Sequence, residues 1–293
     1  MATTKIRSSS IEDGQVANAD LSATIGVTGG QIADNAVTLA KMAGGTDGNL
    51  ITYDASGDPA YVLTGAATEV LTSNGVGAAP TFQAASASGF IGYTVYTAAS
   101  STWTKTDNNP TMLVVEVQGA GGSGGGGGAS KGAGGGAGGY VRKFLNAATL
   151  ADIDTCTVEV GAGGLNPTTN STGNPGGASK FYKASGSGSF PSIDGLGGAG
   201  GVYSYGAGGL GGVSSGGDLN ISGGSGGGNS NENNHGGGSF FTPSHYSITS
   251  GLNPSGPGTG YGGGGEGSRV TGGGAGSKGG DGMDGIVIVW EYK

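Results

Sequence analysis

Two histidines and a pair of closely spaced aspartates are the residues of this chain whose types best suit chemistry. His235 and His245 are the only histidines and lie ten residues apart, which does not match a helical pair of metal ligands. Asp281 and Asp284 lie in Gly-Gly-Asp-Gly-Met-Asp-Gly, where turn formation explains them. A glycosidase pair is defined by the separation of its carboxylates in space, which sequence spacing does not give. We therefore expect no catalytic residue, no enzyme activity, no metal and no other cofactor.

Matches to the Gly-x-Gly-x-x-Gly pattern are frequent but do not indicate a nucleotide site. Such a site needs a strand before the glycines and, after them, a helix whose N-terminus holds the phosphate. No helical pattern follows any of these glycines. With a net charge of −8 and no basic patch, nucleic acid is not an expected partner either.

One segment, residues 229–248, departs from its glycine-rich surroundings with Asn, His, Tyr and two adjacent Phe side chains. A glycine scaffold leaves aromatic rings exposed, and such rings beside Asn and Ser suit sugars or loops of outer-membrane proteins. The alternative is that the two Phe rings fill a small local core. The candidate receptor-binding residues are Tyr203, Tyr205, Phe240, Phe241, His245, Tyr246 and Tyr261.

Glycine dominates the composition, with 72 of 293 residues. The glycines keep no three-residue period, which excludes collagen, and 11% charged residues is too low for charge-driven disorder. Fixing each glycine costs roughly 0.5–1 kcal/mol more than fixing alanine. We expect two compensations: close packing of glycine backbones as polyproline-II-like strands with Cα–H···O contacts, and sharing of a core between subunits.

Strand-like runs flank the glycine-rich stretches. Residues 119–139 lie between the apolar runs 112–118 and 140–145, and a glycine-rich stretch leads into the last run, 286–292. These patterns predict a mostly β, antiparallel sandwich-like domain whose C-terminal strand is central and buried on both faces. The glycine runs between 195 and 285 read as packed polyglycine-type strands, with Leu196 and Leu210 pointing inward or between subunits. The seven strand candidates of this domain are 90–96, 101–105, 112–118, 140–145, 155–160, 179–183 and 286–292.

Three regions follow from these patterns: an N-terminal stalk at 1–45, a short β shaft and linker at 46–89, and a glycine-rich tip domain at 90–293. Apolar residues recur every four or five positions in the first region, which suits parallel association of identical chains, although a flexible arm is the alternative. In the second region, 50–53 and 60–63 flank a turn and predict a hairpin.

Cys156 is the single cysteine and lies in a strand-like run, which predicts a buried structural thiol and no disulfide. The N-terminus has no apolar core of a secretory signal, and the longest apolar run, 286–290, is too short to span a bilayer. We expect a soluble product made in a cytoplasm.

Residues 46–59 and 70–83 resemble the modular shaft segments of bacteriophage tail fibres, and 32–41 is similar to N-terminal repeats of the same proteins. The C-terminal part, from 115–122 through 284–289, resembles the glycine-rich tip domain of phage fibres and adhesins. The resemblance implies an elongated homotrimer on the virion with polyglycine-II-like loops. It also implies attachment to another virion protein through the N-terminal segment, and contact with a host glycan or outer-membrane protein. A head fibre or capsid decoration protein, and a silk-like extracellular protein, are the alternatives.

Overall fold

The computed structural model describes residue 32 and the ranges 44–85, 89–105, 109–127, 131–166, 168–203, 206–228, 234–245, 255–269 and 277–293. The chain divides into two compact units, Met1–Ser86 and Ala87–Lys293. Nearly all of the expected stalk, 1–45, lies outside the described residues. None of the helices in the described ranges is long and apolar enough to cross a membrane.

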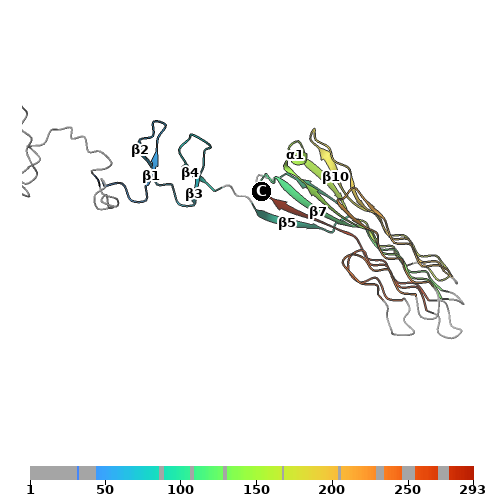
Figure 1. The fold of residues 1–293 in the computed structure, drawn as a ribbon. Helices are drawn as coiled ribbons and strands as arrows, with labels where there is room; N and C mark the ends of the chain where they lie inside the picture. Colours follow the sequence, from blue (N-terminus) through green and yellow to red (C-terminus); the bar gives the residue numbers. More distant parts are fainter. Residues whose placement is uncertain are drawn as a thin grey trace, which may run out of the picture. The chain divides into compact units, whose positions relative to one another are not determined.

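The first unit contains two separate antiparallel hairpins (Figure 1). Strands β1 (Leu50–Tyr53) and β2 (Pro59–Val62) form the predicted hairpin, and β3 (Glu69–Thr72) pairs with β4 (Thr81–Ala84). The Asp54 carboxylate accepts hydrogen bonds from the backbone N–H groups of Ser56 and Asp58 and so closes the first turn. Each of these sheets has two strands among the residues of this unit that the structure describes.

The second unit is an antiparallel β-sandwich, which confirms the predicted fold class for this part of the chain. One sheet has the order β13-β8-β7-β14-β5 and the other β12-β11-β10-β9-β6. The elements are β5 (Phe90–Tyr96), β6 (Ser100–Thr104), β7 (Met112–Gln118), β8 (Tyr140–Leu145), α1 (Ala147–Leu150), β9 (Thr155–Glu159), β10 (Ser179–Ser185), β11 (Ile193–Gly195), β12 (Ser214–Ser215), β13 (Leu219–Ile221) and β14 (Ile286–Tyr292).

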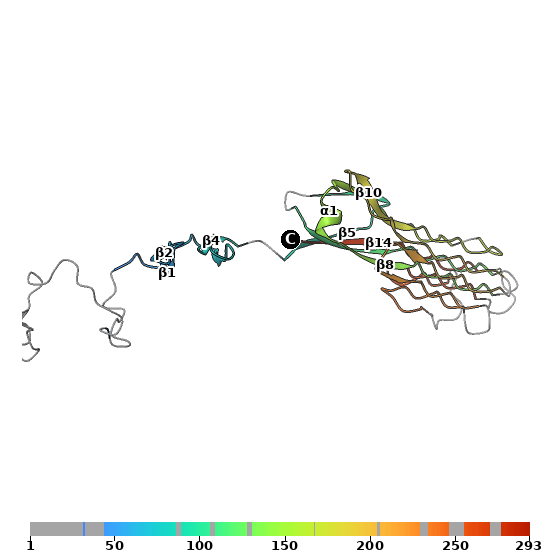
Figure 2. The same cartoon turned by 45° about the horizontal axis from the view of Figure 1, so that its top comes forward.

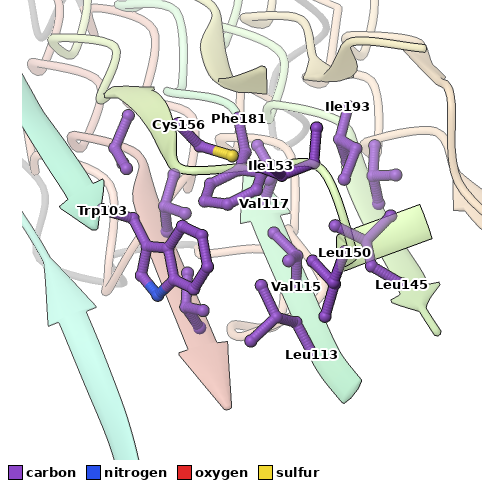
Figure 3. Packing of buried hydrophobic residues seen from close by; sticks show 14 of the residues in the cluster. Trp103, Leu113, Val115, Val117, Leu145, Leu150, Ile153, Cys156, Phe181 and Ile193 are labelled. Atoms are coloured by element: carbon purple, nitrogen blue, oxygen red, sulfur yellow. The ribbon is translucent and has the colours of Figure 1, made fainter. Parts of the chain in front are cut away.

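The hydrophobic core lies between the two sheets (Figure 3). Phe181 on β10 is fully buried, and its ring contacts those of Trp103 and Phe190 at centroid distances of 6.3 and 6.0 Å. The Trp103 Nε1–H donates a hydrogen bond of 2.8 Å to Glu291, which joins β6 of one sheet to β14 of the other. Cys156 lies in this core with no exposed surface, which confirms the buried thiol.

Burial raises the pKa of the Cys156 thiol from 9.0 to about 12. An acid with a raised pKa in the folded state contributes stability that is present below its unfolded pKa and is lost as pH rises. We therefore expect the melting temperature to fall above pH 9, and to fall less steeply between pH 9 and 10 in a Cys156→Ala variant. Thermal melts of the wild type and the variant between pH 9 and 10 test this prediction. Melting temperatures that fall equally steeply with pH in both proteins would contradict it.

The C-terminal strand β14 is interior, as predicted, because it pairs with β7 on one side and β5 on the other. However, β14 is buried on both faces only at its first two residues. Ile286 and Val287 are buried, whereas Ile288, Trp290 and Tyr292 are partly exposed. Their side chains project from the outer face of the sheet, and no described residue of this unit covers that face fully.

The glycine-rich segments continue the strands of the sandwich and run away from it side by side (Figures 1 and 2). In 119–127, successive backbone N–H groups donate in rotation to three neighbours. Gly119 donates to Gly139, Ala120 to Gly177 and Gly121 to Met283, and this order repeats through Gly127. A helix with three residues per turn turns every third residue toward the same neighbour. These segments, which we call the glycine bundle, are therefore packed polyglycine-II-like helices, as predicted. Its main segments are 119–127, 131–139, 171–178, 196–203, 206–213, 223–228, 262–268 and 277–285.

Apart from Gly262, whose φ is 74°, the glycines of these bundle segments have no positive φ, and glycine is needed there for close approach. A Cβ on Gly135 would lie 2.6 Å from the carbonyl carbon of Gly122, and Gly135 does not have a positive φ. Three alanines of the bundle, Ala120, Ala133 and Ala137, are fully buried, whereas Ala199 and Ala207 are exposed. Leu196 and Leu210 do not point inward in this chain, since they are 40% and 72% exposed.

Candidate binding surfaces

Phe240 and Phe241 pack against Tyr140 at the end of the bundle that joins the sandwich. The rings of Phe240 and Tyr140 stack with centroids 3.9 Å apart, and Phe241 meets Tyr140 edge-on at 5.9 Å. Tyr140 is 1% exposed, whereas Phe240 and Phe241 keep 51% and 39% of their surface exposed. Both sequence-based readings therefore describe part of the arrangement: the two rings cover a local core and also remain accessible.

A carboxylate fixes the position of Tyr140. The Tyr140 hydroxyl donates a hydrogen bond of 2.6 Å to Glu116, and the Trp290 Nε1–H donates one of 3.0 Å to its other carboxylate oxygen. Burial, together with the hydrogen bond and negative charge of Glu116, raises the pKa of Tyr140 far above its ordinary value. Glu116 thus links the rings around Phe240 to those on β14.

Aromatic side chains also cluster on β5 and β14, on the outer face of the same sheet. The Trp290 ring lies 4.9 Å from that of Tyr93 and 6.1 Å from that of Phe90, and Phe90 lies 5.7 Å from Tyr292. A depression of about 210 Å³ beside them is lined by Val114, Glu116, Arg142, Trp290 and Tyr292. Sequence reasoning missed this surface, although β5 and β14 both carry several aromatic residues: Phe90, Tyr93 and Tyr96 on β5, and Trp290 and Tyr292 on β14.

Of the other predicted tyrosines that the structure describes, Tyr261 lies near Phe240 and Tyr203 does not. Tyr261 is near Phe240, because the Ser239 hydroxyl donates a hydrogen bond of 2.7 Å to the Tyr261 carbonyl. Tyr203, which is 44% exposed, follows Val202, whose carbonyl accepts from the Ala133 N–H. Tyr203 therefore lies near Ala133, whereas Phe240 lies against Tyr140. A polyglycine-II-like helix rises about 3.1 Å per residue, so the segment from Ala133 to Tyr140 separates the two rings by roughly 20 Å. Tyr205 and Tyr246 lie outside the described residues.

His245 lies against a carboxylate inside the bundle. Its Nε2 is 3.6 Å from Glu266, whose side chain is almost fully buried and accepts a hydrogen bond of 3.2 Å from the Gly256 N–H. His235 contributes its backbone carbonyl, which accepts from the Gly227 N–H. Within the described ranges, no group of three His, Cys, Asp or Glu side chains could hold a metal ion.

The second unit is thus an antiparallel sandwich extended by polyglycine-II-like helices, with exposed aromatic rings at its surface. A family model for a glycine-rich domain matches residues 94–292. Because this match covers most of the chain, the protein belongs to this glycine-rich domain family. A search of curated proteins gave no match.

Proposed function

We propose that this protein is a bacteriophage tail-fibre protein that attaches to a receptor on the host-cell surface through its glycine-rich C-terminal domain. It acts by binding and not by catalysis. The N-terminal segment would attach to another virion protein, and the chain would be made in the host cytoplasm and located on the virion. The resemblance of residues 46–59 and 70–83 to fibre shaft segments is the first support for this proposal.

The exposed hairpins of the first unit are the observation that carries the proposal. Among the described residues of this unit, Val62 is the one buried hydrophobic side chain. Isolated two-stranded hairpins are marginally stable in water. Burial between copies would supply the missing core, which supports self-association, and the resemblance to fibre shafts implies that the assembly is a homotrimer. The large side chains with more than 40% of their surface exposed in this unit include Leu50, Ile51, Tyr53, Tyr61, Leu63, Val70, Leu71 and Val76.

The glycine bundle suits presentation of a binding surface. Its interior consists of hydrogen-bonded backbone, so the backbone that carries the rings at its surface is held in place. A rigid surface loses less conformational entropy on binding than a mobile one. Three such surfaces on one particle add avidity. The receptor would be a surface glycan or an outer-membrane protein.

A Phe240→Ala, Phe241→Ala double variant tests the proposed receptor site. We expect binding of the purified chain to susceptible bacteria to weaken about 30-fold or more, because truncating hot-spot aromatics typically costs at least about 2 kcal/mol. Leu165→Ala is the matched control, since Leu165 is 72% exposed in the same unit.

Circular dichroism and light scattering must show that the double variant keeps its fold and mass, because Phe240 also covers Tyr140. Unchanged binding by this folded variant would place the receptor site elsewhere.

The second candidate is a structural head fibre or capsid decoration protein, since exposed hairpins would stabilise any appendage built from several copies. Labelling the protein on intact phage particles would decide between a tail fibre and a head fibre or decoration protein. We expect the label at the tail; a label distributed over the capsid would favour the second candidate.

A further inference from the structure

We propose that the outer face of the β13-β8-β7-β14-β5 sheet binds a second copy of this chain. This inference rests on the self-association proposed above and assigns it a surface in the glycine-rich unit. Core residues such as Val115 and Val287 point inward, so the alternate residues of each strand point outward. The outward set on the strands is Leu219, Ile221, Tyr140, Arg142, Phe144, Met112, Val114, Glu116, Gln118, Ile286, Ile288, Trp290, Tyr292, Phe90, Tyr93 and Val95.

The exposed apolar area of this face is large enough for a protein interface. Six of its apolar side chains are between 36% and 58% exposed: Phe90, Tyr93, Val95, Phe144, Leu219 and Ile221. Since one aromatic side chain can bury roughly 150–250 Å², these six alone expose on the order of 500 Å². Contiguous exposed apolar patches on monomeric proteins are rarely larger than this. A standard protein interface buries about 800 Å² of polar and apolar surface per partner.

The chemistry of the face favours a protein over a sugar or an ionic ligand. Both oxygens of Glu116 already accept hydrogen bonds, from Tyr140 and Trp290. The guanidinium of Arg142 lies over the Phe144 ring at 5.2 Å. The aliphatic side chain of Val114 lies opposite Trp290 on the same face, and aromatic rings mixed with aliphatic side chains and an arginine are typical of protein interfaces.

Charge favours a second copy in particular. The chain has a net charge of −8, so two copies carry like net charge. The outward set on this face includes one acidic and one basic side chain, Glu116 and Arg142, and is therefore close to neutral. Two such faces can approach each other without the like-charge repulsion expected elsewhere.

Strand β5 lies at the margin of this face and offers a second copy a further contact along the edge of the sheet. It is an edge strand, and its sequence Phe-Ile-Gly-Tyr-Thr-Val-Tyr contains neither a proline nor a charged residue. Proteins normally protect a free edge with such residues. Phe90 also follows Ser86, the end of the first unit, by only four residues. Copies joined through that unit would hold their β5 strands at high local concentration.

Site-specific photo-crosslinking in the full chain tests the interface. Tyr93 is replaced by p-benzoylphenylalanine, and the control carries the same group at Leu165, which is 72% exposed in the same unit. Illumination should give a product of twice the chain mass from the Tyr93 position and not from Leu165. The crosslinked peptide should map to the outer face of this sheet. Adding Val95→Lys should reduce the product at least tenfold.

Light scattering on the same samples separates the two proposals. A multimer that gives no Tyr93 product would overturn this interface and leave the proposed self-association standing. A monomer would overturn both. A Tyr93 product that forms only with an added virion protein or with bacterial glycans would show that the occupant is not a second copy.

Discussion

Replacing Gly135 by alanine should destabilise the glycine-rich unit by about 3 kcal/mol or more, which corresponds to a fall in melting temperature on the order of 10 °C. Gly135 donates a backbone hydrogen bond to Gly265 and accepts one from Gly237, so it is held by two neighbouring segments. Its Cβ would overlap the backbone of a third, at Gly122. Because the obstacle is backbone rather than a flexible side chain, the helices must separate to admit a methyl group.

Gly228 is the matched control for this change. An added Cβ there meets only the Gly206 carbonyl oxygen, at 3.8 Å, and Gly228 does not have a positive φ. We expect Gly228→Ala to change stability by less than about 0.5 kcal/mol. Thermal melts of both variants make the comparison. Equal melting temperatures for the Gly135 and Gly228 variants would mean that close backbone packing does not hold the bundle together.

Truncating Phe181 to alanine should cost about 3–5 kcal/mol, the range for a large aromatic side chain in a packed core. Phe181 is fully buried between the two sheets and contacts the rings of Trp103 and Phe190. Collapse of the cavity is limited because β10 is hydrogen-bonded to β9 and β11 on both sides.

Urea unfolding monitored by tryptophan fluorescence measures the effect of this truncation, since Trp103 lies in the same core. Leu165→Ala serves as the exposed control, with an expected change below about 0.5 kcal/mol. A Phe181→Ala variant that unfolds at the wild-type urea concentration would contradict the assigned core.

The sequence predicts the long strands of the sandwich because each carries a run of apolar residues bounded by glycine. Residues 112–118, 140–145 and 286–292 were all expected as strands and form β7, β8 and β14. The short strands β11, β12 and β13 were missed. Segments such as Ser214–Ser215 have no apolar pattern, and their extended conformation follows from pairing with a neighbouring strand.

The candidate surfaces could be predicted only in part. The aromatic segment around Phe240 stands out by composition, but its partner Tyr140 is one hundred residues away in the chain. The aromatic cluster on the outer face can be predicted only when the register of β5 against β14 is known, because that register places Tyr93 opposite Trp290. Tyr203 looked like part of the same site because linear sequence gives no measure of distance along the polyglycine-II-like helices.

Binding of the purified full-length chain to a panel of bacterial strains, with its mass measured in solution, tests the proposed function most directly. We predict a trimer that binds susceptible cells saturably and loses that binding in the Phe240→Ala, Phe241→Ala variant. A folded, stable multimer that binds no strain in the panel but attaches to empty phage capsids would contradict receptor binding and favour a structural role on the head.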